Sequence, residues 1–301
     1  MIIQSEPENT NSRVLVFTPT YNERDNIPVI VEEILKQDPK YNLLIVDDNS
    51  PDGTGQIVQG ISRDNERVVG IVRKQKLGLG TAHKLAMIHS LRSGYDVLVT
   101  MDADFSHDPK DIPRLIESLS DSDFVIGSRY MLGGRIDYPF FRRTLSITAN
   151  RLARAFLGVP LHEFTTSFRA FRTSIFDSFD FSSVGAQGYS FFLESVVQIH
   201  RHGYRCAEIP LHFRDRLHGR SKIPRFEIAR GAMTLSRLFA SGLLQRHPRI
   251  SHERLITDPC QDCGNHYLVN RPKRSMGQTE TNRHVACMHC GAAYTLDRRV
   301  R

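Results

Sequence analysis

The chain has 301 residues, of which 40% are hydrophobic and 24% are charged, and its net charge at pH 7 is +7. This is an ordinary globular composition, long enough to bury the core of one or two domains. No apolar run reaches the roughly 18 residues of a membrane span, and residues 1–13 lack the basic-then-apolar pattern of a signal peptide. We therefore expect a cytoplasmic protein in a reducing compartment.

The first two thirds of the chain alternate short apolar runs with amphipathic stretches. Helical spacing of apolar residues predicts helices at residues 27–36 and 80–91. The apolar runs predict strands at residues 13–18, 43–46, 68–72, 97–100 and 124–127. Continuous apolar strands separated by helices favour an α/β fold, with a mostly parallel sheet covered on both faces. Ligands of such sheets bind beyond the carboxyl ends of the strands.

The remainder of the chain predicts a helix at 190–200, a strand at 207–213 and a long amphipathic helix at 223–244. The expected organisation is a domain over residues 1–246 with its core at about 14–244, a linker at 247–259, and a small separate module at 260–301.

Two carboxylates follow the strand at 97–100. Asp102 and Asp104 are two residues apart on an extended segment, so their side chains point to the same side. Like charges this close repel one another unless a cation lies between them. Mg²⁺ or Mn²⁺ suits such oxygen ligands and bridges to phosphates, so the pair indicates a metal-held nucleoside diphosphate. The alternative is a solvated turn after a strand.

Several motifs in register carry a family resemblance. They are residues 18–23, 46–54, 78–82, 102–107, 127–130 and 216–222. Over about residues 14–244 the chain resembles polyprenyl-phosphate sugar synthases of the dolichyl-phosphate mannose synthase type, among family-2 glycosyltransferases. The resemblance implies a GT-A-type Rossmann-like fold. It also implies an inverting enzyme that moves a hexose, with mannose from GDP-mannose the leading choice, to a polyprenyl or dolichyl monophosphate.

The resemblance also assigns roles to residues of the donor site. Glu23 and Asp48 end adjacent strands, and their acceptor-only carboxylates suit the donors of a nucleobase and the hydroxyls of a ribose. Asp104 would be the principal metal ligand, assisted by the hydroxyl of Ser106. For Asp48 and Asp52, turn chemistry is the alternative interpretation. The residues expected to cradle the nucleotide are Pro19, Tyr21, Glu23, Asp48, Asp102 and Ala103.

Basic residues are expected to bind the phosphates of both substrates. Arg129 follows a strand, and Arg142 precedes Ser146 by one helical turn, so these two side chains can grip one phosphate. Arg216 and Lys222 lie in a stretch that could close over the site. By resemblance, this set binds the acceptor lipid phosphate and the donor diphosphate.

The expected mechanism needs no general base, because the nucleophile is a lipid phosphate oxygen that is already anionic. One in-line displacement inverts the anomeric centre. The chain departs from the family pattern where an Asp and a Gly are usual, with Glu163 and Thr166, and where a Gln is common, with Phe192. These changes put the choice of sugar or lipid in doubt more than the reaction type.

We expect contact with the membrane because removing a polyprenyl chain from the bilayer costs about 0.8 kcal/mol per methylene. The lipid acceptor therefore stays in the bilayer, and the enzyme must bind at its surface. The helix at 223–244 is the candidate for docking, although its pattern fits packing on the core equally well. Arg143, Arg151 and Arg154 are expected to be solvated or to face the membrane. We expect a peripheral protein at the cytoplasmic face of the membrane; whether a membrane subunit exists stays open.

The C-terminal module carries two Cys-x-x-Cys-Gly knuckles. Cys260 and Cys263 form the first, and Cys287 and Cys290 the second, at a separation typical of zinc ribbons. The pattern predicts a closed structural zinc site with four cysteines. Cys206, beside a predicted strand, is expected to be an ordinary core residue.

Three other functions are compatible with parts of the sequence. The nearest is transfer from a UDP-sugar such as UDP-glucose. Transfer to a sugar hydroxyl is disfavoured because the chain has no Trp and so no Gln-x-x-Arg-Trp motif. The last is an inert transferase-like domain in a zinc-ribbon protein whose basic clusters, at 129–172 and 201–249, bind nucleic acid. Because Asp104, Arg129 and Arg216 are all present, no nucleic-acid partner is expected.

Overall fold

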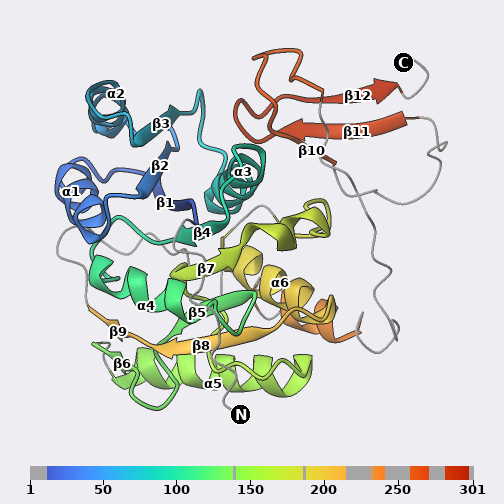
Figure 1. Cartoon of the computed structure of the whole chain (residues 1–301). Helices are drawn as coiled ribbons and strands as arrows, with labels where there is room; N and C mark the ends of the chain where they lie inside the picture. Colours follow the sequence, from blue (N-terminus) through green and yellow to red (C-terminus); the bar gives the residue numbers. More distant parts are fainter. Residues whose placement is uncertain are drawn as a thin grey trace, which may run out of the picture.

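A seven-stranded sheet forms the centre of the protein, with the strand order β3-β2-β1-β4-β7-β5-β8 (Figure 1). The computed structural model describes residues 12–137, 140–185, 188–214, 231, 233–240, 258–270 and 282–297. The strands of the sheet are β1 (Val14–Thr20), β2 (Tyr41–Asp47), β3 (Val68–Val72), β4 (Val97–Thr100), β5 (Phe124–Ser128), β7 (Arg169–Arg172) and β8 (Cys206–Pro210). All pairings are parallel except those of β7 with β4 and β5. The predicted mostly parallel α/β fold is therefore confirmed.

Helices cover both faces of this sheet (Figure 1). One face carries α1 (Ile27–Gln37), α2 (Thr54–Asp64), the short η1 (Pro109–Asp111) and α4 (Ile112–Glu117). The other carries α3 (Leu79–Arg92), the short η2 (Thr173–Asp177) and α6 (Gly188–Arg201), and α5 (Phe140–Leu157) lies below β8 in the view of Figure 1. Side chains of β1 alternate between two apolar clusters: Leu15 and Phe17 pack with α3 and α6, and Val14 and Val16 pack with α1 and α4.

Strand β7 was not predicted, because only Ala170 and Phe171 form its apolar run. It is held by Arg169, whose side chain is 1% exposed. This guanidinium donates hydrogen bonds to the backbone carbonyls of Phe164, Thr166 and Phe192 and to the hydroxyl of Ser195, at 2.7–3.2 Å. Burial lowers the pKa of Arg169 to about 9, although the charge of Glu163 opposes this shift. A strand that begins with a charged residue is therefore an inner strand of the sheet, between β4 and β5.

The strand expected at 207–213 is divided in two. β8 ends at Pro210, and β9 (His212–Phe213) pairs with β6 (Arg135–Ile136) in a separate two-stranded sheet. Between them, the Leu211 amide donates to the Ser128 carbonyl, and the Leu211 carbonyl accepts from the amide of Arg135. The chain changes sheets at this residue, so the two strands cannot form one continuous element.

Only part of the helix expected at 223–244 can be checked, since residues 223–230, 232 and 241–244 lie outside the described residues. Residues 233–240 are helical. Leu235 and Leu238 pack against the core cluster on the α3 side, and Arg201 donates to the Leu238 carbonyl at 2.9 Å. Met233 is 70% exposed and Phe239 is 38% exposed. One face of this helix therefore packs on the core, while the other is open.

The C-terminal region forms a three-stranded antiparallel sheet beside α3 (Figure 1). Its strands are β10 (Leu268–Asn270), β11 (Asn282–Cys287) and β12 (Ala293–Asp297). The expected linker lies outside the described residues except for 258 and 259, so the domain boundaries stay a prediction. No helix within the described ranges combines the length and apolar character needed to cross a bilayer.

Arg169→Met should lower the free energy of unfolding by roughly 3–5 kcal/mol, because three buried carbonyls and a hydroxyl lose their donor. Urea unfolding with zinc and Mg²⁺ held constant measures the change. The matched control is Arg63→Met at the exposed end of α2, which should stay within about 0.5 kcal/mol of wild type. A loss below about 1 kcal/mol for Arg169→Met would show that this network does not hold β7.

Candidate active site

Three strands of the sheet end in strained turns at the same edge. Within the described residues, the non-glycine residues with positive φ are Asn22 (57°), Asn49 (61°) and Phe105 (59°). They follow β1, β2 and β4, which are neighbouring parallel strands. Asn tolerates this left-handed conformation, but a bulky Phe rarely adopts it. Strain of this kind persists only where the surroundings enforce it, and it concentrates at functional sites.

Asp47 ties the ends of β1 and β2 together. Its carboxylate accepts hydrogen bonds from the Thr20 hydroxyl at 3.1 Å, the Ser50 amide at 2.9 Å and the Ser50 hydroxyl at 2.5 Å. The amide of Asn22 donates to the same Ser50 hydroxyl at 2.9 Å. Asp47 therefore positions the two strand ends that carry Tyr21, Glu23 and Asp48.

Asp52 stabilises the turn after β2, which was the alternative interpretation of this residue. It accepts from the amide and hydroxyl of Thr54, at 3.0 and 2.6 Å, and from the amide of Arg24 at 3.3 Å. Partial burial opposes ionisation, but these hydrogen bonds outweigh it and lower the pKa of Asp52. Thr54 in turn accepts from the Glu23 amide at 3.0 Å, and the Glu23 carboxylate accepts from Asn26 at 2.8 Å.

The Asp48 carboxylate is held by the loop at residues 73–78. It accepts from the amides of Leu77 and Gly78, both at 2.8 Å, and from Arg73 at 3.1 Å. Arg73 is 1% exposed and also donates to the Thr81 hydroxyl at 2.8 Å. The sequence pattern did not single out Arg73, because nothing around residue 73 predicts burial of its charge.

The same loop approaches Tyr21. The ammonium of Lys76 lies 3.4 Å from the centroid of the Tyr21 ring, a cation–π contact. Pro19 lies in β1, one position before the last residue of that strand. The predicted nucleoside residues of β1 and β2 thus lie at one sheet edge with the 73–78 loop beside them.

Asp102 and Asp104 follow β4 at that edge. Asp104 is 4% exposed, and its carboxylate accepts from the Ser106 amide at 3.1 Å and hydroxyl at 2.6 Å. The Asp102 side chain is 33% exposed, and Ala103 between them is buried. The Asp102 amide lies 3.3 Å from Nδ1 of His107. The second aspartate is thus rigidly oriented, while the first faces a more open side.

His107 packs beneath this turn. Its ring stacks on Phe168 with centroids 5.1 Å apart, and Nε2 lies 3.1 Å from the Thr166 hydroxyl. Nδ1 can accept from the Asp102 amide if Nε2 carries the proton and donates to Thr166. Thr166, which replaces the usual Gly, therefore supports the carboxylate turn, a role that the sequence pattern did not predict.

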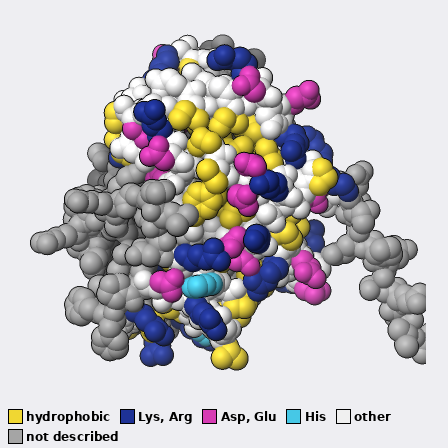
Figure 2. Space-filling model, turned by 90° about the vertical axis from the view of Figure 1, so that its left-hand side faces the viewer, with side chains coloured by type: hydrophobic (Ala, Val, Ile, Leu, Met, Phe, Trp, Pro, Cys, Tyr) yellow, Lys and Arg dark blue, Asp and Glu magenta, His cyan; other side chains and the backbone are white. Residues whose placement is uncertain are grey.

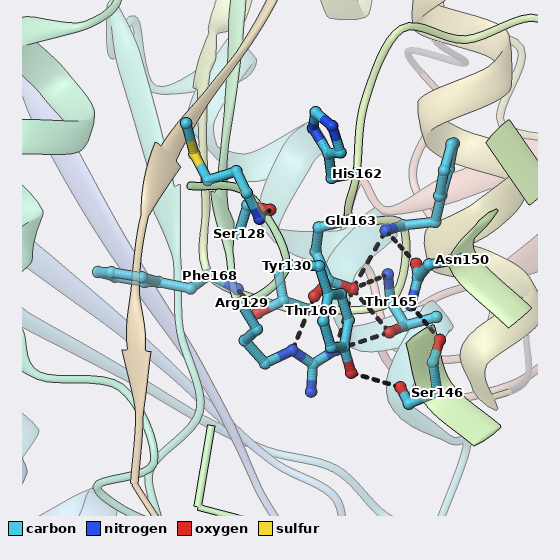
Figure 3. Close-up of polar contacts among 12 residues, drawn as sticks. Ser128, Arg129, Tyr130, Ser146, Asn150, His162, Glu163, Thr165, Thr166 and Phe168 are labelled. Carbon is cyan, nitrogen blue, oxygen red and sulfur yellow. Dashed lines mark hydrogen bonds and ion pairs between the residues drawn. The ribbon is translucent and has the colours of Figure 1, made fainter. Parts of the chain in front are cut away.

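Arg129 is paired with Glu163 in a bidentate ion pair (Figure 3). Nε and Nη2 of Arg129 donate to the two carboxylate oxygens at 2.7 and 2.9 Å, and Nη2 also donates to the Thr165 hydroxyl at 2.8 Å. Glu163 is fully buried and Arg129 is 8% exposed. Burial opposes ionisation of the carboxyl, but the charge of Arg129 together with the hydrogen bonds from Arg129 and Thr165 lowers the pKa of Glu163.

Ser146 belongs to a network that joins α5 to the same turn (Figure 3). The Tyr130 hydroxyl donates to the Ser146 hydroxyl at 2.5 Å. Asn150 donates to the Ser146 carbonyl at 2.9 Å and accepts from the Phe164 amide at 3.0 Å. The structure therefore brings Ser146 to the Arg129 region through Tyr130.

The other predicted phosphate-binding residues are only partly described. Arg142 lies in α5, but its side chain is outside what the structure describes. Arg216 and Lys222 also lie outside the described residues. The chain leads into that stretch from Arg214, whose amide donates to the Ser106 carbonyl at 3.3 Å.

A cavity of about 740 Å³ lies beside Arg129. It is lined by the 129–137 segment and by residues of α5, together with His162. Five arginines line it: Arg129, Arg135, Arg143, Arg151 and Arg154. The last three were expected to be solvated or to face the membrane; they are exposed, and they also form a wall of this cavity. So dense a positive lining favours an anionic ligand.

The four cysteines of the C-terminal module form one cluster. Their sulfur atoms all lie within 4.8 Å of one another, and the Cys260–Cys290 and Cys263–Cys287 pairs are 3.6 and 3.8 Å apart. A tetrahedral zinc with bonds of about 2.3 Å requires sulfur atoms roughly 3.8 Å apart. The donor set and spacing therefore fit a four-coordinate metal ion.

A parallel sheet with paired aspartates at its carboxyl edge and a cavity rich in arginine nearby defines a class of protein that handles nucleotide phosphates. The chain belongs to glycosyl transferase family 2, whose family model matches residues 15–179. This confirms the family suggested by the motifs.

Two bacterial relatives are similar over most of the chain. Polyprenol monophosphomannose synthase of Mycolicibacterium smegmatis is 38% identical over 78% of this chain and 89% of its own length. Undecaprenyl-phosphate mannosyltransferase of Micrococcus luteus is 37% identical over 70% of this chain and 87% of its own length.

Solved structures share the fold at lower identity. Glucosyl-3-phosphoglycerate synthase from Mycobacterium tuberculosis, solved with Mn²⁺, UDP and phosphoglyceric acid, has a TM-score of 0.57 at 20% identity and covers 79% of this chain and 80% of that one. The mannosyltransferase PcManGT from Pyrobaculum calidifontis, solved with GDP-Man and Mn²⁺, has a TM-score of 0.53 at 21% identity and covers 79% of this chain and 67% of that one. These neighbours confirm the GT-A-type fold.

Glu163→Gln should destabilise the protein by about 3–5 kcal/mol at pH 7, because Arg129 is left buried without its counter-charge.

The Glu163 carboxylate should also make the stability of the wild-type protein depend on pH. The folded-state pKa of Glu163 is lowered, so its stabilising contribution is present above the unfolded-state pKa and is lost as pH falls through the folded-state value. Urea unfolding from pH 7 to pH 3 should show this loss in wild type and not in Glu163→Gln. Parallel acid profiles for the two proteins would contradict it.

The purified protein should contain about one zinc ion per chain, measured by elemental analysis. Cys287→Ser should lose most of this zinc, because one ligand of four is removed. Cys206→Ser is the matched control: this thiol lies in β8 and outside the cluster, so zinc content should not change. Equal zinc in both variants would show that the cluster is not the zinc site.

Proposed function

We propose that this protein transfers a mannosyl group from GDP-mannose to a polyprenyl monophosphate, with inversion of the anomeric centre. The similarity to two bacterial polyprenyl-phosphate mannosyltransferases, over most of their lengths, carries the proposal. The intact carboxylate edge beside a cavity rich in arginine supports it, because the reaction brings together a nucleoside diphosphate and a second phosphate.

The donor binds at the ends of β1, β2 and β4. Glu23 and Asp48 offer carboxylate oxygens to the nucleoside, with Pro19 and Tyr21 beside them. Asp102 and Asp104, with Ser106, supply the hard oxygen ligands that Mg²⁺ or Mn²⁺ prefers. The main support for a metal ion here is Asp104, because the Ser106 hydroxyl donates a hydrogen bond to its carboxylate at 2.6 Å and fixes its orientation. When bound, the ion neutralises charge on the diphosphate.

The acceptor phosphate binds in the cavity beside Arg129. The bidentate pair with Glu163 fixes the plane of the Arg129 guanidinium, so binding a phosphate costs little side-chain entropy. By the sequence pattern, Arg142 and Ser146 are expected to bind the same phosphate; Ser146 is hydrogen-bonded to Tyr130, which lines the cavity. By resemblance, Arg216 and Lys222, which lie outside the described residues, belong to the same phosphate-binding set.

The reaction is then a single displacement. A lipid phosphate oxygen forms a bond to the anomeric carbon, and the bond from that carbon to the diphosphate oxygen breaks, so that GDP leaves with the electron pair. The nucleophile is already anionic, so no side chain needs to remove a proton. The arginines bring two anions together and hold them in line. An α-linked donor gives a β-linked product.

Binding at the membrane surface fits the exposed apolar residues near α5. Leu152 and Phe156 of α5 are 45% and 47% exposed, and the ring of Phe156 lies 5.2 Å from that of Phe239. Leu152 and Phe156 belong to the same helix as Arg151 and Arg154, which line the arginine-rich cavity. We place the protein at the cytoplasmic face of the membrane, where a lipid acceptor can reach the cavity.

On the face that carries α1, α2 and α4, charged side chains of both signs are mixed. Figure 2 shows that Lys and Arg side chains there are interspersed with Asp and Glu around a group of hydrophobic side chains. A phosphate backbone favours a continuous basic surface instead.

The test is transfer of labelled sugar to a polyprenyl phosphate in detergent, with GDP-mannose and UDP-glucose compared in Mg²⁺ or Mn²⁺. Wild type should form mannolipid from GDP-mannose, and Asp104→Asn should lower kcat/KM at least 100-fold, because the principal metal ligand is weakened. Asp64→Asn, at the exposed end of α2, is the matched control and should match wild type. If product forms only from UDP-glucose, the donor is a UDP-sugar and not GDP-mannose. If the folded protein forms no product from either donor, the proposal is refuted.

A further inference from the structure

The second cysteine knuckle packs directly on the loop at residues 73–78. The Gln75 side chain donates to the Cys290 carbonyl at 3.2 Å. Gly291, at φ +81°, leaves no space between them: a Cβ at this position would lie 2.6 Å from Nε2 of Gln75 and 2.7 Å from Cδ2 of Leu77. The positive φ favours glycine here, and any larger residue would also displace the ends of the Gln75 and Leu77 side chains.

The other side of the same loop holds the proposed nucleotide site. Leu77 and Gly78 donate their amides to Asp48, and Lys76 lies over Tyr21. Gln75, which contacts the knuckle, is separated from Leu77 by a single residue. A movement of the knuckle would therefore be passed to the amides that orient the Asp48 carboxylate.

Arg73 connects the two sites electrostatically. Its Nη1 contacts Asp48, but Nε and Nη2 are buried and find no hydrogen-bond acceptor among the described residues. Burial lowers the pKa of Arg73, opposed by the negative charge of Asp48 and, more weakly, by that of Cys287 when its sulfur is ionised. Four thiolates around Zn²⁺ carry a formal charge of −2. A loaded cluster therefore favours the buried cation that also pairs with Asp48.

The helix that follows the loop is held by the same module. Nδ1 of His89 in α3 lies 3.0 Å from the Tyr267 hydroxyl. Val269 and Met288 join the apolar cluster to which α3 contributes, and both are at least 94% buried. The cysteine module thus contacts both the 73–78 loop and, through His89, the last turn of the helix that follows it.

We propose that the four-cysteine module, loaded with zinc, positions the nucleotide-binding loop, and that Gln75 and Arg73 are positioning residues that act on the donor through Asp48. This inference rests on the proposed function, since it assigns the donor nucleotide to Asp48. The effect is specific to the donor, because the lining of the arginine-rich cavity includes no residue of the loop or of the cysteine module.

The test compares the full-length zinc-loaded protein with Gln75→Ala. This variant keeps all four cysteines, so it should retain one zinc per chain. The dissociation constant for GDP, measured by calorimetry in Mg²⁺, and the KM for GDP-mannose should both rise roughly five- to tenfold, the effect of losing one positioning hydrogen bond. The kcat and the KM for polyprenyl phosphate should stay within about twofold of wild type. Gln59→Ala on the exposed side of α2 is the matched control.

Zinc removal provides a second measurement. After chelation and dialysis into Mg²⁺, binding of GDP should weaken further than in Gln75→Ala and should recover on addition of zinc. Hydrogen exchange of the amides at residues 73–81 should become faster in the zinc-free protein, while amides of β1 and β4 keep their protection.

Two results would overturn this inference. One is an unchanged dissociation constant for GDP in both Gln75→Ala and the zinc-free protein. The other is an equal loss for donor and acceptor, which would indicate a general loss of stability. If zinc-loaded wild type binds neither GDP nor UDP, the proposed function itself fails, and this inference fails with it.

Discussion

Parallel pairing of β1 with β2 and with β4 is the constraint on which the site depends. It brings the residues after three strands to one edge of the sheet, although they are separated by tens of residues in the chain. A residue with positive φ follows each strand, at Asn22, Asn49 and Phe105, and these turns leave carboxylates at the edge. Asp47 and Ser106 then fix these turns with short hydrogen bonds. The edge is rigid before any ligand arrives, and this lowers the cost of binding.

Buried arginines form the second level of organisation. Arg73, Arg129 and Arg169 are each at least 92% buried, and each joins segments far apart in the chain. Removing a guanidinium from water is costly, and an ion pair only partly offsets that cost. What these groups supply is geometry: a planar guanidinium with several donors fixes its partners in both distance and angle. Arg129 is the one that also lines a cavity, so in this residue the structural pairing serves ligand binding.

The sequence predicted the fold well where burial leaves a local pattern. Continuous apolar runs identified β1 to β5, and helical spacing identified α1 and α3, because the side chains that each element packs against its neighbours form a regular pattern in its own sequence. β7 was not predicted because its first and last residues are Arg169 and Arg172. The hydrogen-bond acceptors that allow Arg169 to be buried come from residues up to 26 positions away. Arg73 was missed for the same reason. Aspartates after strands were recognisable as a group, but their individual roles depend on tertiary contacts: Asp47 and Asp52 shape turns, and Asp48 is held by a distant loop.

The cysteine module shows why a motif outside the family pattern can still belong to the active site. As a sequence it forms a separate unit at the end of the chain, with its own ligands and glycines. In the folded protein its second knuckle contacts Gln75 and Leu77, and its apolar residues complete a cluster shared with α3. A loop that presents amides to a carboxylate has few apolar contacts of its own and would open readily. A rigid metal-bound turn placed against it compensates for that weakness at the point where the donor is recognised.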